Sequence, residues 1–219
     1  MPIFYQQDID EDTKVGIWKI EEDEHFFLQK AIPQRNVTHP HKKLQHLAGR
    51  YLLSYLFPDF PIELIKIADT RKPFLEDEAF HFSISHCGDY AAAIVSVTKR
   101  VGVDSEIPSD KIEKIQNKFV SPKELKVLDG NFTQQGSLIF KSSNSQILKL
   151  TYAWSCKEAV FKWYGLGGVD FKGHMEITSI IPDDDQHTNT ILLFKKHEEL
   201  FLNLCTIFFD DLCLTYVVT

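Results

Sequence analysis

The C-terminal third of the chain contains four consecutive segments in which apolar and polar residues alternate, near 174–181, 189–196, 202–209 and 212–218. Alternation with a period of two residues is typical of β-strands that bury one face. Strands that follow one another through short connections pair in antiparallel order. These segments therefore predict an antiparallel meander.

Two long helices are expected. Residues 147–164 form one, which should stop at Gly165. Residues 40–57 form the other, because six apolar or aromatic positions fall on one stripe at helical spacing: Leu44, Leu47, Ala48, Tyr51, Leu52 and Tyr55. A second face of this helix carries Lys43, His46 and Arg50.

The remaining expected elements are shorter. They are strands at 13–20, 62–68, 81–85, 90–97 and 101–105, helices at 21–32, 110–119 and 121–128, and a polar loop at 129–146. Ser121 and Pro122 are a good N-cap and first-turn pair for the helix at 121–128. Each half of the chain thus mixes helices with short antiparallel strands, so we expect an α+β fold with subdomains 1–100 and 101–219.

Net charge, cysteine spacing and hydropathy argue against several classes of protein. The 219 residues carry 24 basic and 31 acidic side chains, a formal net charge of −7, which argues against a general nucleic-acid binder. The four cysteines have no zinc-ligand spacing and are expected to be free thiols in a reducing cytoplasm. The chain shows no signal peptide and no apolar segment long enough to span a membrane.

Asp104 and Glu106 are the first candidate site residues. They stand two residues apart at the end of an apolar run, so on a strand they share one face. Two adjacent carboxylates suit a divalent cation such as Mg²⁺. A solvated strand end that leads into Pro108 is the alternative.

Glu158 and Lys162 are the second pair. With Trp154 they fall at i, i+4 and i+8 on the helix 147–164, so all three share one face. The alternative is an aromatic anchor beside a surface Glu–Lys pair. Together, three acids and a lysine suit Mg²⁺-dependent chemistry at a phosphate.

Two further segments indicate a binding site for an anion. The strand ending in Ser85-His86-Cys87-Gly88 leads into a turn where backbone amides and a histidine can face a phosphate. Ser85 and His86 are adjacent and point apart on an extended chain, so a catalytic triad is not expected. Arg71-Lys72-Pro73 forms a stiff basic corner, or else a plain surface turn.

In this order and spacing the segments resemble the Sfp-type 4′-phosphopantetheinyl transferases. Arg71-Lys72-Pro73 is similar to that family's Gly-Lys-Pro-like corner, and residues 82–88 are similar to its Phe-Asn-Ile-Ser-His-Ser-Gly segment, with Ser83 in place of Asn. Residues 102–106 resemble its Gly-Ile-Asp-Ile-Glu segment, and residues 154–162 its Trp-Ser-x-Lys-Glu-x-x-x-Lys helix.

The resemblance implies two similar subdomains in a pseudo-twofold arrangement, with the active site at their junction and coenzyme A bound there. The implied reaction transfers 4′-phosphopantetheine from coenzyme A to a serine of an apo carrier protein and releases adenosine 3′,5′-bisphosphate. The first subdomain would hold the adenosine and 3′-phosphate, and the second Mg²⁺ and the catalytic helix. A single chain would then form a whole site, so we expect a monomer.

Carried over residue by residue, Asp104, Glu106 and Glu158 would hold Mg²⁺, with Glu158 also the base for the carrier serine. Lys162 would contact the pyrophosphate. The other implied coenzyme A contacts are Ser85 and His86 at a phosphate, Arg71, Lys72 and Pro73 at the adenosine end, and Lys30, Arg35 and Arg50 at the 3′-phosphate. Apolar residues of the loop 129–146, among them Phe132, could contact the carrier.

Two other readings stay open. Another Mg²⁺-dependent nucleotidyl- or phosphotransferase would need the same acids, but not the Ser-His-Cys-Gly turn and the Lys-Pro corner at this spacing. A non-catalytic module that binds coenzyme A or a carrier would not need three carboxylates and Lys162. The sequence does not identify the carrier or its pathway.

Overall fold

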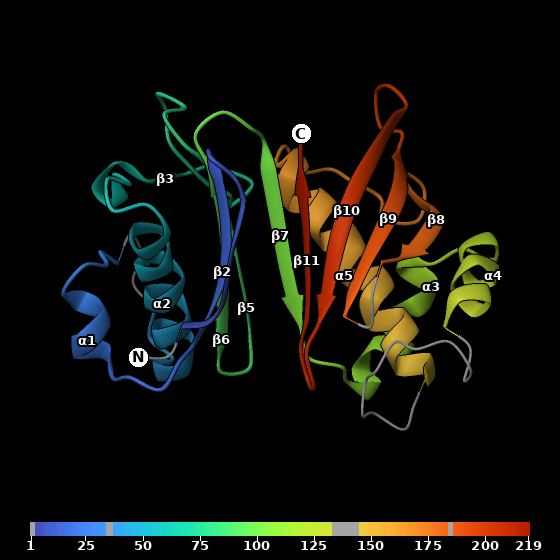
Figure 1. Ribbon diagram of the computed structural model, residues 1–219, viewed down its shortest axis with the longest axis horizontal. Helices are drawn as coiled ribbons and strands as arrows, with labels where there is room; N and C mark the ends of the chain where they lie inside the picture. The colour runs from blue at the N-terminus through green and yellow to red at the C-terminus, as the bar shows by residue number, and fades with distance from the viewer. Residues whose placement is uncertain (1–2, 34–36, 133–144, 184–185) are drawn as a thin grey trace. The chain divides into compact units, whose positions relative to one another are not determined.

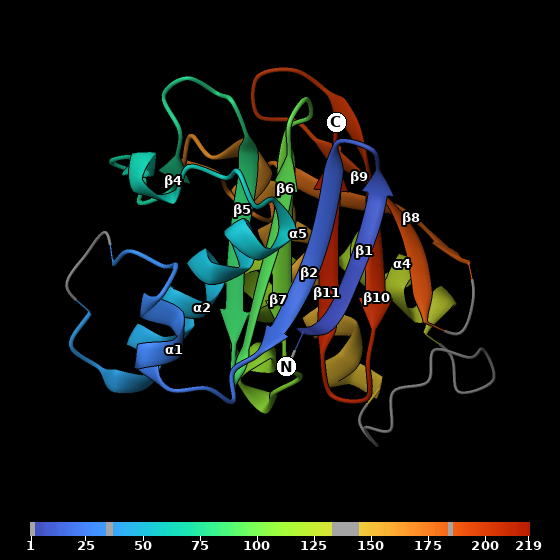
Figure 2. The same ribbon diagram turned by 60° about the vertical axis from the view of Figure 1, so that its left-hand side comes forward.

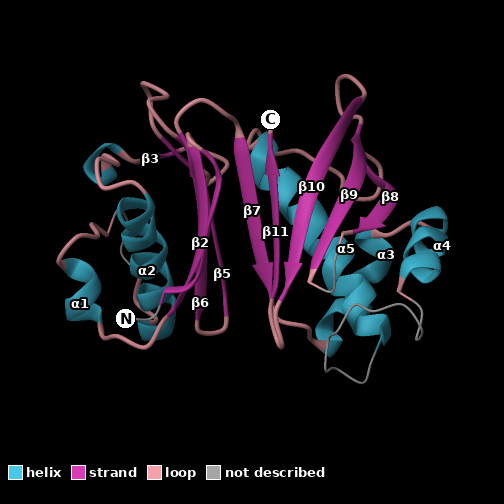
Figure 3. Cartoon of the chain, viewed as in Figure 1, coloured by secondary structure: helices cyan, strands magenta, loops and turns pink. Residues whose placement is uncertain are grey.

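The computed structural model describes residues 3–33, 37–132, 145–183 and 186–219. The chain divides into two compact units, Met1–Val103 with Thr219, and Asp104–Val218. Each unit packs helices against a sheet whose neighbouring strands pair in antiparallel order (Figure 3). The α+β fold class is therefore confirmed.

The first unit contains a four-stranded sheet. Its strand order is β1-β2-β6-β5, with β1 at Ile3–Asp10, β2 at Thr13–Lys19, β5 at His81–Cys87 and β6 at Tyr90–Ser96. Helix α2 (Pro40–Leu56) crosses one face of this sheet (Figure 1). The shorter elements are α1 (Glu24–Leu28), the 3₁₀ helix η1 (Ile62–Leu64), and a small hairpin of β3 (Lys66–Ile67) and β4 (Pro73–Phe74).

Helix α2 approaches strand β5 at Gly49. A Cβ atom built on Gly49 would lie 2.6 Å from Cγ2 of Ile84, closer than packed carbon atoms come. Leu47, Ala48 and Leu52 on the same helix are fully buried in the core of this unit. The missing side chain at Gly49 is thus what allows α2 to lie so close to β5.

Gly49→Ala should consequently destabilise the protein by about 1–3 kcal/mol, because an added methyl group in a packed core forces its neighbours to move. Gly130→Ala is the matched control: Gly130 also lies in a helix, but no described atom outside its own stretch of helix lies within 4 Å of its Cβ position. Because alanine is the better helix former, that variant should be as stable as the parent or more stable by up to about 1 kcal/mol. Denaturant unfolding of both variants checks the pair; equal stabilities would contradict this packing.

The second unit contains a five-stranded sheet of order β7-β11-β10-β9-β8 (Figure 2). The strands are β7 (Val101–Glu106), β8 (Met175–Pro182), β9 (His187–Phe194), β10 (Leu200–Phe208) and β11 (Cys213–Val218). The helices are η2 (Asp110–Ile115), α3 (Gln116–Phe119), α4 (Pro122–Asn131) and α5 (Ser145–Tyr164). Helix α5 packs on β11 and β10, and α4 packs on β8.

Several expected elements are confirmed. The strand at 13–20, the helix at 40–57, the helix at 147–164 and the C-terminal meander all form. Gly165, with φ 73°, ends α5 in the left-handed conformation that glycine adopts most easily. Ser121 caps α4, and Glu124 completes a reciprocal capping box with it.

Other expectations were wrong. The helix predicted at 21–32 covers only Glu24–Leu28, because Asp23 is its N-cap and Pro33 disfavours helical backbone just before it. The predicted strand at 62–68 is a 3₁₀ turn followed by the two-residue β3. Most of the helix predicted at 110–119 is the 3₁₀ helix η2. No strand was expected at β1.

The predicted loop at 129–146 is shorter than expected, since α4 continues to Asn131 and α5 begins at Ser145. Phe132 is partly buried and packs on Tyr152 at the edge of the core, with ring centroids 5.0 Å apart. The rest of the suggested carrier surface, within 133–144, lies outside the described residues. No helix among the described residues is long and apolar enough to cross a membrane.

Candidate active site

The second unit brings its acidic and basic candidates together from two elements. Asp104 and Glu106 lie at the end of β7, and Glu158 and Lys162 lie on the C-terminal half of α5. The Lys162 ammonium donates to Asp104 Oδ1 at 2.6 Å. The spacing of i and i+2 on a strand and i and i+4 on a helix therefore gives one cluster, as the sequence predicted.

Trp154 belongs to the same cluster. Its indole N–H donates to Glu106 Oε1 at 3.0 Å. Its ring packs between Phe119 and Phe171, with centroids 5.1 and 5.2 Å away. Trp154 is thus an aromatic anchor that also fixes the orientation of the Glu106 carboxylate. Glu158 and Lys162 belong to a partly buried cluster and are not a simple surface pair.

The carboxyl groups of the cluster repel each other in a buried setting. Burial, and then the nearby Asp104 carboxylate, raise the pKa of Glu106 to about 8, although the bond from Trp154 lowers it. Burial and Asp104 also raise the pKa of Glu158 to about 7, against a lowering effect of Lys162. Near neutral pH these two acids therefore retain part of their protons, and a bound cation would favour their ionised forms.

The chemistry of these side chains fits a divalent cation. Three carboxylates supply the hard oxygen donors that Mg²⁺ prefers, and their excess charge is what such an ion would offset. Among the described residues, however, no three His, Cys, Asp or Glu side chains are already grouped as metal ligands. A cation bound by these carboxylates would share Asp104 with the Lys162 ammonium.

Lys157, next to Glu158 on α5, was given no role from the sequence. Its side chain is fully buried and pairs with Glu124 at 2.6 Å. Its ammonium also donates to three backbone carbonyls, those of Phe119, Phe171 and Met175. Glu124 in turn accepts from the amides of Ser121 and Ile177. This ion pair ties α5 to α3, α4 and β8, and so fixes the helix that carries Glu158.

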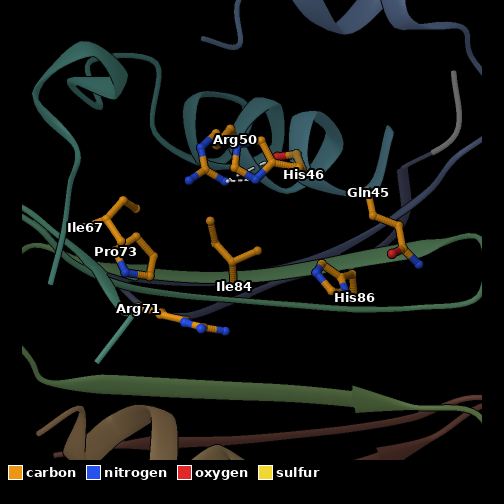
Figure 4. A pocket seen from close by; sticks show the side chains of 8 residues that line it. All are labelled: Gln45, His46, Arg50, Ile67, Arg71, Pro73, Ile84 and His86. Carbon is orange, nitrogen blue, oxygen red and sulfur yellow. Dashed lines mark hydrogen bonds between the residues drawn. The ribbon is translucent and has the colours of Figure 1, made fainter. Parts of the chain in front are cut away.

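The first unit contains a separate pocket of about 140 Å³ between α2, β5 and the β3–β4 hairpin (Figure 4). Cationic or potentially cationic side chains converge on it from three elements: His46 and Arg50 from α2, Arg71 from the hairpin, and His86 from β5. None of the eight described residues that line it is acidic. A phosphate group would match this pocket in size and charge.

Arg50 is held in place inside this pocket. Both Arg50 and His46 are about 5% exposed. Arg50 Nη1 donates to His46 Nδ1 at 3.1 Å and to the His46 carbonyl at 3.4 Å (Figure 4). Gln45 donates to the carbonyl of Gly88 at 2.7 Å, which fixes the turn after His86 to the same helix.

Of three other residues expected to contact coenzyme A, one lines the pocket and two do not. Pro73 lines the pocket beside Arg71, whose φ of 68° shapes the tight turn between β3 and β4. Lys72 does not line the pocket; burial, and then Arg100, lower its pKa to about 8. Ser85 is buried and not among the lining residues, since it lies one position from His86 on β5.

Two candidates are not among the residues that line the pocket in the described part of the chain. Lys30 is exposed in the turn after α1 and does not line it. Arg35 lies outside the described residues. By contrast, His46 and Gln45 were not predicted to line the pocket. The spacing of His46 and Arg50 at i and i+4 could have indicated His46, but no sequence signal indicated Gln45.

Ser83, which stands where the resembling family has Asn, has a clear structural role. Its hydroxyl accepts the backbone N–H of Val103 at 3.1 Å. Val103 immediately precedes Asp104 on β7. This hydrogen bond fixes the backbone at Val103, the last residue of the first unit before Thr219.

Comparison with known proteins agrees with this arrangement. The model of the 4′-phosphopantetheinyl transferase superfamily matches residues 100–217, which include all four groups of the acidic cluster. The enterobactin synthase component D of Salmonella austin is 35% identical over 121 residues, covering 55% of this chain and 47% of that protein. The same component of Escherichia coli K12 is 31% identical over 124 residues, covering 55% and 54%.

A vertebrate protein matches over a longer region. The L-aminoadipate-semialdehyde dehydrogenase-phosphopantetheinyl transferase of Xenopus laevis is 28% identical over 187 residues, covering 69% of this chain and 59% of that protein. The chain thus spans about half the length of the curated relatives it matches. Because the family model covers more than half of the sequence, the chain belongs to the 4′-phosphopantetheinyl transferase superfamily.

Proposed function

We propose that this protein transfers the 4′-phosphopantetheine group from coenzyme A to a serine hydroxyl of an apo carrier protein and releases adenosine 3′,5′-bisphosphate. The proposal depends above all on one observation: Asp104 and Glu106 from β7 meet Glu158 and Lys162 from α5 in a chain of this superfamily. These four side chains supply three things: oxygen donors for a cation, a base, and a positively charged ammonium group.

Asp104, Glu106 and Glu158 are the proposed holders of Mg²⁺. When bound, the ion would supply a Lewis acid that neutralises charge on the pyrophosphate. Glu158 would take the proton of the carrier serine, directly or through a water molecule. In the metal-free protein, burial and Asp104 raise the pKa of Glu158 to about 7, and a bound cation would favour the ionised carboxylate that a base requires.

The serine oxygen would then attack the phosphorus atom that carries the pantetheine arm. The bond between this phosphorus and the bridging oxygen breaks, and the electron pair leaves with the adenosine bisphosphate. Lys162 would neutralise charge on that leaving group. Such reactions depend mainly on positioning and charge neutralisation, which is what this cluster offers.

The pocket of the first unit is the proposed binding site for a phosphate of coenzyme A. Arg50, Arg71 and His86 would supply the positive charge and the donors, and Gln45 and His46 would hold the neighbouring backbone and guanidinium in place. Lys72, Ser85, Lys30 and Arg35 remain candidates for further contacts. The carrier and its pathway are not identified by these residues.

Arg50→Met should raise the KM for coenzyme A by about 10–100-fold, because a charge-assisted hydrogen bond to a phosphate contributes roughly 1.5–3 kcal/mol. The kcat at saturating coenzyme A should change little. Lys43→Met is the control, since Lys43 lies on the same helix but pairs with Glu24 and does not line the pocket. Equal KM values for the two variants would contradict the assignment of the pocket.

The function itself is tested by mass spectrometry of the carrier. The protein is incubated with coenzyme A, Mg²⁺ and several apo carrier proteins, and each carrier is weighed intact. A gain of one phosphopantetheine group on serine, with release of adenosine 3′,5′-bisphosphate, supports the proposal. A nucleotide-sized gain would indicate a different transferase, and binding without any gain would indicate a non-catalytic module.

A further inference from the structure

We propose that Lys162 and the divalent cation exchange at Asp104: the ammonium neutralises this carboxylate before the cation binds and moves to a substrate phosphate afterwards. This inference rests on the proposed function and deepens it, because it assigns Lys162 two successive partners. It starts from the contact of 2.6 Å between Lys162 Nζ and Asp104 Oδ1.

Asp104 cannot easily hold both cations at once. Its side chain is 4% exposed, so water screens the site poorly. A Mg²⁺ ion binds carboxylate oxygen at about 2.0–2.1 Å. With the ammonium still at its present distance from the same oxygen, two positive centres would lie within about 5 Å of each other, and their repulsion would be strong in this buried setting.

The structure also shows that the acids are not yet arranged as metal ligands. Glu106 accepts from Trp154, Asp104 accepts from Lys162, and no described group of three acids forms a ready-made metal site. A cation that binds one of these carboxylates competes with its present contact for the same negative charge. The contact between Lys162 and Asp104 is the one most affected, because the Lys162 ammonium and the incoming cation are both positive and repel each other.

Lys162 is able to move. It lies in the last turn of α5, and its side chain is 23% exposed, whereas that of Lys157 is fully buried. A lysine stem has four flexible carbons and presents its ammonium as a point charge, which suits a phosphate oxygen as well as a carboxylate. A phosphate held near the cluster is thus the natural second partner.

The exchange has a thermodynamic consequence. Without a phosphate, the cation must compete with Lys162 for Asp104, so its affinity is reduced. With coenzyme A bound, the ammonium has another anion to contact, and the affinity for the cation rises. By linkage, the cation then increases the affinity for coenzyme A by the same factor.

Binding of Mn²⁺ to the protein without coenzyme A, followed by electron paramagnetic resonance, tests the exchange. Lys162→Met should bind Mn²⁺ about tenfold more tightly than the parent, or more, because the competing ammonium is gone. Lys149→Met is the matched control: it removes the same charge from the same helix, but its partner is Asp129. Its Mn²⁺ affinity should stay within about twofold of the parent.

Lys162→Arg is the second variant. It keeps a positive charge at this position, so its Mn²⁺ affinity should stay as weak as that of the parent. Equal or weaker Mn²⁺ affinity in Lys162→Met would overturn the exchange, as would an equal gain in Lys149→Met. The carrier-mass experiment on the parent protein reports separately on the function. A tenfold gain in Mn²⁺ affinity without carrier modification would keep the exchange and reject the transfer, and the reverse result would do the opposite.

Discussion

Lys157→Met should lower the free energy of unfolding by about 3–5 kcal/mol, the cost of removing one partner from a buried ion pair. The variant leaves the Glu124 carboxylate buried at 1% exposure without its cation. It also removes the donor to the carbonyls of Phe119, Phe171 and Met175. Denaturant unfolding measures the loss.

Glu124→Gln should restore part of this stability when combined with Lys157→Met. The amide oxygen can still accept a backbone N–H, but the uncompensated charge is gone. Lys149→Met is again the control: its partner Asp129 is exposed, so the loss should be about 0–1 kcal/mol. A loss below about 1 kcal/mol in Lys157→Met would contradict the view that this pair fastens α5 to its neighbours.

Glu158→Gln should reduce kcat by about 10²–10⁴-fold at saturating coenzyme A, Mg²⁺ and carrier, the range expected for removing a positioned base. Glutamine preserves the size of the side chain, so the fold should be kept, and at saturating Mg²⁺ the KM for coenzyme A should change little. Initial rates of adenosine 3′,5′-bisphosphate release give both constants.

Glu199→Gln provides the comparison for this experiment, because Glu199 is an exposed acid in the same unit and should leave kcat unchanged. Circular dichroism of Glu158→Gln checks that the helix remains. A kcat within about threefold of the parent would remove Glu158 from the chemistry and leave at most a structural role for it.

The parts of the fold that could be predicted are those with a strong local signal. The apolar stripe of 40–57, the Ser121-Pro122 start of α4 and Gly165 at the end of α5 each determine backbone geometry within a few residues. The edge strand β1 has no such signal, because its side chains are only partly buried and its register with β2 is irregular.

For the candidate site, too, the features within one element could be predicted and the contacts between elements could not. The spacing of Asp104 with Glu106, and of Glu158 with Lys162, predicts which side chains share a face. Spacing does not determine the partner across elements, so the contacts of Lys162 with Asp104 and of Trp154 with Glu106 required the structure. Lys157 could not be recognised as buried, since a lysine beside a glutamate on a helix usually faces solvent.

The central claim is that the acidic cluster on β7 and α5 catalyses phosphopantetheine transfer, and intact-mass measurement of an apo carrier tests it most directly. The parent protein and Asp104→Ala are incubated side by side with coenzyme A and Mg²⁺. The account predicts a phosphopantetheine-sized gain with the parent and none with the folded Asp104→Ala variant. A carrier modified equally by both proteins, or by neither, would contradict it.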